Sequence, residues 1–378
     1  MRHTAYIVLA IAALIASACG RRTATSTEAF TRQIYTPHYA AGFAITGTPD
    51  GDAVLIETSS PWQGSGPERR RLVIGNTNLA ADPDMQSIQK PARRIVCMSS
   101  THVAMLGAIG CSDRIVGVSG LDFISDPYVN AHRDAIADVG YEPDVDYERI
   151  LALAPDLVLL YGVTGPSGME SKLRELGIPY AYVGEYVESS PLGKAEWMVA
   201  MGEITGARTA AEQAFALLPP RYDSLRRAAA AMPERPRVMI NAPYGDSWFM
   251  PSTSSYMARL IEDAGGDYIY RNDTGDKSET VDVEQAYLMA SQADCWINVG
   301  QIASLAELRS RHPKFADVEC VRRGRIYNCN RRMTAAGGND FWESSVVHPD
   351  VVLHDLIGVF HPEAGITDDQ LYYYKRIE

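Results

Sequence analysis

Short apolar runs alternate with helical patterns along residues 93–183. Helix-breaking glycine or proline residues separate the two kinds of segment. Near-continuous apolar strands joined by helices are typical of a parallel sheet that is covered on both faces. The pattern predicts strands at 94–98, 115–118, 157–160 and 180–183.

Residues 237–328 repeat this plan. The segment Asp144–Glu148 corresponds to Thr280–Glu284, and each is followed by a helix, an aspartate and an apolar strand. Two copies indicate one internal duplication rather than a solenoid, which needs at least three. The sequence therefore predicts two related, Rossmann-like α/β lobes with parallel sheets.

A helical segment separates the two lobes. Residues 194–232 are rich in Ala, Leu, Glu, Met and Arg, which favour helix. Pro219 and Pro220 predict a kink or break, with a second helical segment starting near Pro220, because proline inside a helix costs about 3 kcal/mol.

The first 90 residues differ from the rest. Strand signals at 42–45, 53–56 and 71–74, with turn chemistry at 49–52, predict a small β extension. The predicted organisation is a signal peptide (1–18), a lipidated tether (19–34), the β extension (35–90), an N-terminal lobe (91–190), a linking helix (191–232), a C-terminal lobe (233–362) and a tail (363–378).

The leader indicates export. Arg2 precedes an apolar run, residues 5–18, that is too short to cross a bilayer and ends in small residues before Cys19. This arrangement is similar to a bacterial lipobox, in which the cysteine is lipidated. We expect a membrane-anchored protein on the periplasmic side or the cell surface; the alternative is a plain signal peptide with a chance cysteine.

Composition narrows the class of protein. Hydrophobic residues make up 46% of the 378 residues and charged residues 22%, which is typical of globular proteins. The net charge of −12, without a basic block, argues against nucleic-acid binding.

The five cysteines after Cys19 carry no metal-site spacing. Cys97 and Cys295 lie in predicted strands and are expected to be buried thiols. Cys320 and Cys329 flank a predicted hairpin turn at 322–325, and a disulfide between them remains open.

Enzyme motifs are weak. The chain has neither a dinucleotide-binding glycine motif nor a phosphate-binding loop. Gly245-Asp246-Ser247 is similar to the start of some esterases but lies far into the chain. We therefore expect no catalytic residues, with an exported hydrolase or a surface structural or adhesion lipoprotein as alternatives.

Several of these stretches together resemble class III periplasmic binding proteins of ABC importers. The similarity covers residues 91–362 and rests on 94–119, on 148–158, on Gly265-Gly266 and on a late hairpin at 323–327. It implies a substrate-binding lipoprotein that captures an iron complex (siderophore or haem) between its lobes, or alternatively vitamin B12 or another corrinoid. The implied partners are a permease dimer with its ATPase, and no intrinsic cofactor is expected.

The resemblance also implies one permease-docking glutamate on each lobe, Glu148 and Glu284 by motif position. Two carboxylates near helix starts on related lobes suit a two-fold basic partner. The alternative is that both are ordinary first-turn glutamates favoured by the helix dipole.

Candidate ligand contacts follow from the fold, because ligands of open α/β sheets lie at the carboxyl ends of strands. Aromatic faces suit a macrocycle or catechol chelate, and arginine suits an anionic ligand. The alternatives are core packing for the tryptophans and solvated charge for the arginines. The candidates are Ser99, Ser100, Thr101, Tyr161, Trp248, Arg331, Arg332 and Trp342, with Gln301 and Tyr244 along the same cleft.

The histidines are scattered, and no His-rich loop is present. We therefore predict no metal site formed by the protein itself. His102, just inside the first helix of the N-terminal lobe, is a weak candidate for an axial ligand to haem or cobalt.

Overall fold

The computed structural model describes residues 26–75, 82, 84–245, 247–272 and 277–378. The predicted signal peptide and the lipidation site Cys19 lie outside the described residues. Within the described ranges, no helix has the length and apolar character needed to cross a membrane.

The N-terminal lobe is a parallel α/β unit, as predicted. Its five strands pair in the order β10-β9-β6-β7-β8, and all neighbours are parallel. The Ser99 hydroxyl caps the first helix by accepting a hydrogen bond from the Thr101 N–H. The elements are β6 (Ile95–Cys97), α2 (Ser100–Ala108), β7 (Ile115–Val118), α3 (Pro127–Ala131), β8 (Ala137–Asp138), α4 (Tyr147–Leu153), β9 (Leu157–Leu160), α5 (Glu170–Glu175) and β10 (Tyr180–Tyr182).

The C-terminal lobe has a related sheet of order β13-β11-β15-β16-β17, in which β17 alone among the described strands is antiparallel. A separate hairpin pairs β12 with β14. The elements are β11 (Arg237–Ile240), β12 (Ser247–Met250), α9 (Tyr256–Asp263), β13 (Asp267–Tyr268), β14 (Glu279–Asp282), α10 (Val283–Ala290), β15 (Cys295–Ile297), α11 (Leu305–Arg311), α12 (Glu319–Arg322), β16 (Ile326–Asn328), α13 (Phe341–Ser344), α14 (Pro349–Phe360) and β17 (Lys375–Arg376).

Two predictions for the C-terminal lobe are wrong. Residues 319–328 form helix α12, a turn at Gly324 and strand β16, so Cys320 is helical and no hairpin places it near Cys329. All five cysteines from Cys97 onward are buried free thiols. The expected tail belongs to the lobe, because β17 extends the sheet and buried Asp355 accepts the backbone N–H groups of 372–374.

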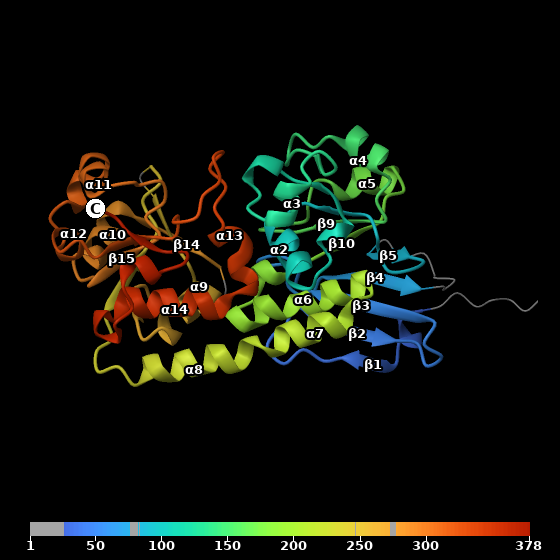
Figure 1. Cartoon of the computed structure of the whole chain (residues 1–378), viewed down its shortest axis with the longest axis horizontal. Helices are drawn as coiled ribbons and strands as arrows, with labels where there is room; N and C mark the ends of the chain where they lie inside the picture. The colour runs from blue at the N-terminus through green and yellow to red at the C-terminus, as the bar shows by residue number, and fades with distance from the viewer. Residues whose placement is uncertain (1–25, 76–81, 83, 246, 273–276) are drawn as a thin grey trace, which may run out of the picture.

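The segment between the lobes folds as three helices, with the expected break near the two prolines and a further break that was not predicted: α6 (Pro191–Thr205), α7 (Arg208–Ala216) and α8 (Leu218–Ala230). Gly206, in the left-handed region with φ of 74°, ends α6. The break before α8 falls at Leu217, so both prolines lie inside the first turn of α8, where missing N–H groups cost little. Helix α8 runs beneath the C-terminal lobe, where it packs on α14, and α7 continues the line toward the N-terminal lobe (Figure 1).

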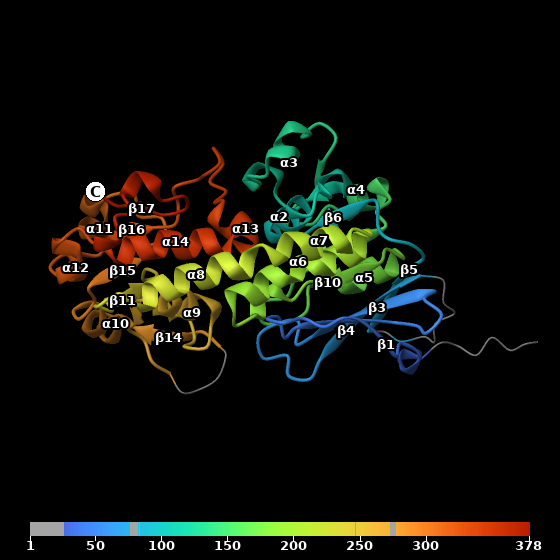
Figure 2. The ribbon, with the colours of Figure 1, turned by 60° about the horizontal axis from the view of Figure 1, so that its bottom comes forward.

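The predicted β extension is a five-stranded sheet, here called the N-terminal sheet. It comprises β1 (Arg32–Tyr35), β2 (Phe43–Gly47), β3 (Ala53–Ser59), β4 (Arg69–Gly75) and β5 (Met85–Ile88), and it begins at residue 32 rather than 35. One face contributes Ile45 and Ile56 to the main core, and the other face covers a small cluster around Phe30. The sheet lies beside α5 and β10 of the N-terminal lobe (Figure 2).

Two buried carboxylates hold the N-terminal sheet on the body. Glu196 of α6 accepts hydrogen bonds of 2.7–2.8 Å from the Tyr35 hydroxyl and from the N–H groups of 38–40. Glu188, just before α6, accepts from the N–H groups of 41–42 and from the Trp197 indole. A buried carboxylate is stable only when it accepts hydrogen bonds, and residues 38–42 supply them. In turn, the two glutamates hold this loop between β1 and β2 in place.

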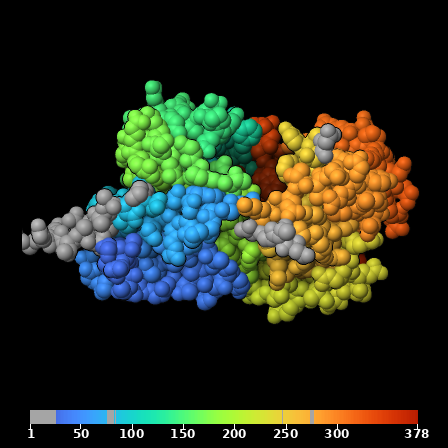
Figure 3. Space-filling model, turned by 180° about the vertical axis from the view of Figure 1, so that it is seen from behind, coloured from blue at the N-terminus to red at the C-terminus, as the bar shows by residue number. Residues whose placement is uncertain are grey.

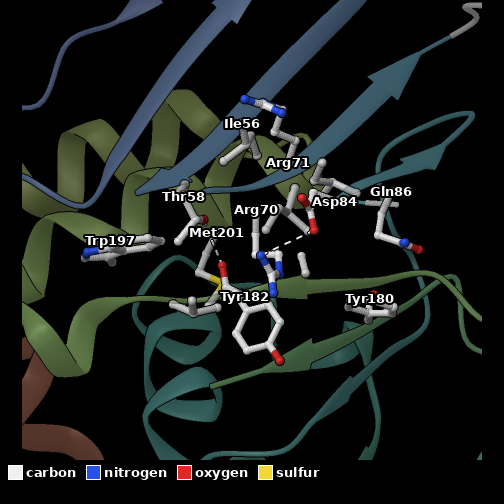
Figure 4. Close-up of a pocket in the computed structure, with 15 residues that line it drawn as sticks. Ile56, Thr58, Arg70, Arg71, Asp84, Gln86, Tyr180, Tyr182, Trp197 and Met201 are labelled. Carbon is white, nitrogen blue, oxygen red and sulfur yellow. Dashed lines mark hydrogen bonds and ion pairs between the residues drawn. The ribbon is translucent and has the colours of Figure 1, made fainter. Parts of the chain in front are cut away.

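A small apolar pocket of about 20 Å³ lies in the seam between this sheet and the N-terminal lobe (Figure 4). The Thr58 hydroxyl donates to the Tyr182 carbonyl across the seam, and Arg70 pairs with Asp84 on its rim. The space suits about one water molecule, so we assign the pocket to packing rather than to ligand binding.

Candidate ligand-binding site between the lobes

A large cavity lies at the carboxyl edge of the C-terminal sheet. Its main compartment has a volume of about 690 Å³, within the usual range for small-molecule sites. A side compartment of about 230 Å³ adjoins it and shares Asn241, Asn298 and Trp342 in its wall. Residues 186–189 of the N-terminal lobe line the side compartment, so the cavity reaches the junction of the lobes.

Three parallel strands of the C-terminal lobe deliver asparagines to this cavity. Asn241 follows β11, Asn298 follows β15, and Asn328 ends β16. Asn241 and Asn298 have φ of 68° and 57°, a left-handed conformation that asparagine tolerates better than most residues. The sheet edge therefore brings three carboxamides to the cavity wall. Asn241 already donates to the Phe249 carbonyl at 2.7 Å, and Asn328 donates to the Gly300 carbonyl at 2.6 Å, so Asn298 is the strand-end amide left for a ligand.

Asn298 has free hydrogen-bonding capacity. Its side chain is 6% exposed, and neither Oδ1 nor Nδ2 makes a hydrogen bond of good geometry within the described part of the chain. The hydroxyl of Tyr374 also lacks a hydrogen bond of good geometry, and the Asn298 side chain is the polar group that interacts with it. An unpaired buried amide costs about 1–3 kcal/mol, so a polar ligand group that reached Asn298 would recover that energy.

The rest of the wall is aromatic or amide-bearing. Trp342, Tyr244 and Phe249 are 52%, 80% and 51% exposed, although all three are large apolar side chains. Asn330, Asn339 and Gln301 add further carboxamides. Such rigid aromatic faces beside hydrogen-bonding groups suit a large ligand with apolar faces and a polar edge.

Charge is sparse in the main compartment. None of its described lining residues is Asp or Glu, and Arg311 with His312 supplies the basic character. Burial and the neighbouring Arg311 lower the pKa of His312, which favours its neutral form. The compartment is therefore nearly neutral overall.

Some predicted ligand residues lie near the cavity. Trp342 lines both compartments, and Tyr244 and Gln301 line the main one. Tyr161, 40% exposed, follows β9 at the carboxyl edge of the other sheet. Ligand contact by Trp342 and Tyr161 remains a prediction.

The first turn of α2 does not line either compartment. The Thr101 hydroxyl donates to buried Glu185 at 2.6 Å and also contacts the Ser99 hydroxyl. These internal partners explain why Ser99 and Thr101 face the protein rather than the two compartments. Ser100 lies in the same turn and is also absent from the described lining.

Three predicted ligand residues lie outside the described lining of both compartments; the expectation is wrong for the buried Trp248 and stays a prediction for the exposed Arg331 and Arg332. Trp248 is completely buried, donates to the Ile240 carbonyl and packs on Trp296 and Phe315. Arg331 donates to the carbonyl of residue 368. Arg332 pairs with Asp340 at 2.8 Å and stacks on the ring of Tyr372, so its charge is already neutralised within the fold.

His102 is also misplaced as an axial ligand. Its ring is completely buried and has no hydrogen-bond partner among the described residues. Burial lowers its pKa to about 4 despite the nearby Glu185 carboxylate. Within the described ranges, no group of three or more His, Cys, Asp or Glu side chains forms a metal site.

A strap formed by residues 330–343 connects the lobes beside the cavity. The Thr334 hydroxyl donates to the Asp122 carbonyl at 2.9 Å, and Glu343 accepts the Ser125 N–H at 2.7 Å. Gly338 packs so closely on the backbone of Phe123 that a Cβ atom would lie 2.0 Å from its carbonyl oxygen. Met333 and Trp342 of the strap line the cavity.

The two predicted docking glutamates occupy equivalent positions. Glu148 is the second residue of α4 and Glu284 the second of α10, and the aspartate before each helix, Asp146 or Asp282, caps it. Both glutamates are exposed. Glu284 also pairs with Lys314, and the hydrogen bond from Lys314 lowers the pKa of the Glu284 carboxyl. Docking on a permease remains a prediction.

Comparison with known proteins identifies the family. A periplasmic binding protein family model matches residues 95–333, so the chain belongs to that family. An uncharacterized lipoprotein from Methanocaldococcus jannaschii is 26% identical over 288 residues, covering 73% of this chain and 67% of that protein. The resemblance seen in the sequence is confirmed, and the family comprises binding proteins rather than enzymes.

Solved structures share the fold. A periplasmic haem-binding protein from Pseudomonas aeruginosa has a TM-score of 0.56 and 18% identity, covering 72% of this chain and 93% of that one. A periplasmic vitamin B12-binding protein from Vibrio cholerae has a TM-score of 0.55 and 17% identity, covering 72% and 98%. At these identities the similarity establishes the two-lobed fold.

Sequence reasoning missed much of the cavity wall. The strand-end asparagines were visible as three apolar runs that each finish in asparagine: Val238–Asn241, Cys295–Asn298 and Ile326–Asn328. By contrast, Gln63 of the N-terminal sheet lines the side compartment, and no local pattern places it there.

Proposed function

We propose that this protein is the substrate-binding lipoprotein of an ABC importer and that it carries a metal chelate of low net charge. The observation that carries the proposal is the buried Asn298 carboxamide, which lines both compartments without a hydrogen bond of good geometry. Carboxamides pair well with amide, hydroxamate or hydroxyl groups, each of which offers donors or acceptors without full charge.

This lining favours two of the three ligand classes that the sequence left open. Haem carries two carboxylates, which need cationic partners. Arg331 and Arg332 are engaged elsewhere, and Arg311 of the main compartment already pairs with Glu307 at 2.8 Å. A corrinoid with peripheral amides, or a ferric hydroxamate siderophore of low net charge, matches the Asn298 carboxamide and the aromatic wall. The haem- and B12-binding names of the structural neighbours support the general ligand class.

Direct binding tests the proposal. Cyanocobalamin, ferric desferrioxamine B and haemin are titrated into the purified protein while tryptophan fluorescence is followed. We expect one of the first two to bind most tightly. Asn298→Asp keeps the shape and the left-handed backbone but adds charge, and it should weaken that binding about tenfold or more.

Asn130→Asp serves as the matched control, because Asn130 is exposed on α3, outside the described cavity lining. Binding of none of the probes would contradict the proposed function. Tightest binding of haemin would contradict the preference for a ligand of low net charge but not the role as a substrate-binding protein.

The proposed anchor is tested separately. Cys19→Ser should move the protein from the membrane fraction to the soluble fraction and abolish its labelling with palmitate. Acyl chains contribute about 0.8 kcal/mol per buried CH₂ to membrane binding. Palmitate labelling that persists in the variant would contradict lipidation at Cys19.

A further inference from the structure

The hairpin tip between β3 and β4 (residues 60–66) projects from the N-terminal sheet toward the cavity. Its shape is fixed by hydrogen bonds from the Ser60 N–H to the Glu68 carbonyl and from the Ser60 hydroxyl to the Gly66 carbonyl. The strands below it pair without interruption from Ala53 to Ser59. The tip is thus an ordered turn with a defined conformation. It lies outside residues 95–333, which the family model matches.

The tip is anchored on the N-terminal lobe at the carboxyl end of β9. Trp62 is 5% exposed and belongs to the core cluster of that lobe, with its ring 5.6 Å from that of Tyr182. The Gln63 N–H donates to the Val163 carbonyl at 3.0 Å. A Cβ atom at Gly162 would lie 2.9 Å from the Trp62 ring, so glycine is required for this close approach.

The same tip reaches the C-terminal lobe. A Cβ atom at Gly64 would lie 2.6 Å from the Lys277 side chain, next to Ser278, which lines the side compartment. The surface of the N-terminal sheet meets that of the C-terminal lobe when the molecule is seen from behind (Figure 3). One short loop therefore contacts both lobes at the edge of the cavity.

From this placement we propose that the hairpin tip is a third wall of the ligand site and that Gln63 is a specificity-determining residue. Gln63 lines the side compartment opposite residues of the C-terminal lobe and adds a carboxamide to those of the sheet edge. Glu188, which accepts hydrogen bonds from the N–H groups of 41–42, lines the same compartment. The inference rests on the proposed function and extends it to the ligand: one with a hydrogen-bonding group on its side toward the N-terminal sheet.

Three variants test this inference with the same three probes, cyanocobalamin, ferric desferrioxamine B and haemin. Gln63→Ala should raise the Kd of the probe that binds the wild type about three- to tenfold, because one hydrogen bond is lost. Gln63→Trp should raise it further by filling the compartment. Gln89→Ala, which truncates an exposed glutamine beyond β5, should leave the Kd unchanged.

Thermal melting of each variant separates binding from folding, and we expect all three to melt near the wild type because Gln63 is only half buried. Wild-type binding with equal Kd values for Gln63→Ala, Gln63→Trp and Gln89→Ala would overturn the third wall and leave the proposed function intact. A wild type that binds none of the probes would overturn both.

Discussion

The carboxylate of Glu343 accepts a hydrogen bond from the backbone N–H of Ser125 and so joins the strap to the N-terminal lobe. The Glu343 side chain is 2% exposed, and burial raises its pKa to about 7. A contact between the lobes therefore contains a carboxyl group that titrates near neutral pH.

Glu343 should make stability depend on pH. Between its ordinary pKa of about 4.5 and about 7, the folded protein holds a proton that the unfolded chain releases. Its contribution to the free energy of unfolding therefore falls as pH rises through this window, by up to about 3 kcal/mol. Glu343→Gln should remove this fall, so the variant gains stability relative to the wild type between pH 5 and pH 8 in urea unfolding.

Glu175→Gln is the control for Glu343, because Glu175 is an exposed residue of α5 whose side chain is 67% accessible. We expect its unfolding curves to follow those of the wild type at both pH values. A constant difference between Glu343→Gln and the wild type from pH 5 to pH 8 would contradict the raised pKa.

Removing Glu196 should loosen the N-terminal sheet. Glu196→Ala leaves four hydrogen-bond donors without their acceptor, at a cost on the order of 3 kcal/mol or more. Urea unfolding measures the loss, and limited proteolysis should cut residues 32–90 faster. Glu212→Ala on α7 breaks a partly exposed ion pair with Arg208 and should cost less than about 1 kcal/mol. Equal losses in the two variants would argue against the anchoring role.

Two tryptophans should separate binding from folding. Trp342→Ala should weaken binding of the preferred probe by about 1–3 kcal/mol while changing the melting temperature little, because the ring lines the cavity and is half exposed. Trp248→Ala should cost about 3–5 kcal/mol of stability and leave the affinity of the folded protein unchanged. Measuring both quantities on both variants decides the assignment, and the opposite pattern would reverse it.

The prediction that Glu148 and Glu284 dock on the permease is tested by measuring transport, because ligand binding alone does not involve the permease. Glu148→Arg combined with Glu284→Arg should abolish uptake of the ligand by cells, because reversed charges opposite permease arginines cost several kcal/mol. Ligand affinity of the isolated protein should stay within a few-fold. Glu175→Arg with Glu262→Arg makes the same charge change at exposed positions elsewhere on the two lobes. Uptake lost equally in both double variants would point to net charge rather than to docking.

The two lobes were predictable because a buried parallel strand has a strong local signature. Apolar runs such as Leu157–Leu160 are fully buried in the sheet, and the duplicated Asp-x-Glu helix starts appear at Asp146 and Asp282. The three-helix linker was less visible, because the left-handed break at Gly206 has the same sequence appearance as a glycine inside a helix.

The site was harder to predict because side-chain partners are set by tertiary structure. Trp248 follows a strand, as a ligand residue would, but the β12–β14 hairpin turns it onto Trp296. In the sequence Arg332 is a candidate to bind an anionic ligand, but folding places Asp340 beside it as an ion-pair partner. Gln63 reaches the cavity only because the N-terminal sheet docks on α6, a contact with no counterpart in local sequence.

The contacts on both sides of the cavity have a kinetic consequence. The strap joins the lobes at Asp122 and Ser125, and the hairpin tip touches Lys277 of the opposite lobe. Because these contacts already set the separation of the lobes, ligand capture requires little rearrangement of the backbone. Association should then proceed in one step, with an observed rate that rises linearly with ligand concentration and does not level off, and differences in affinity between ligands should lie mainly in their residence times.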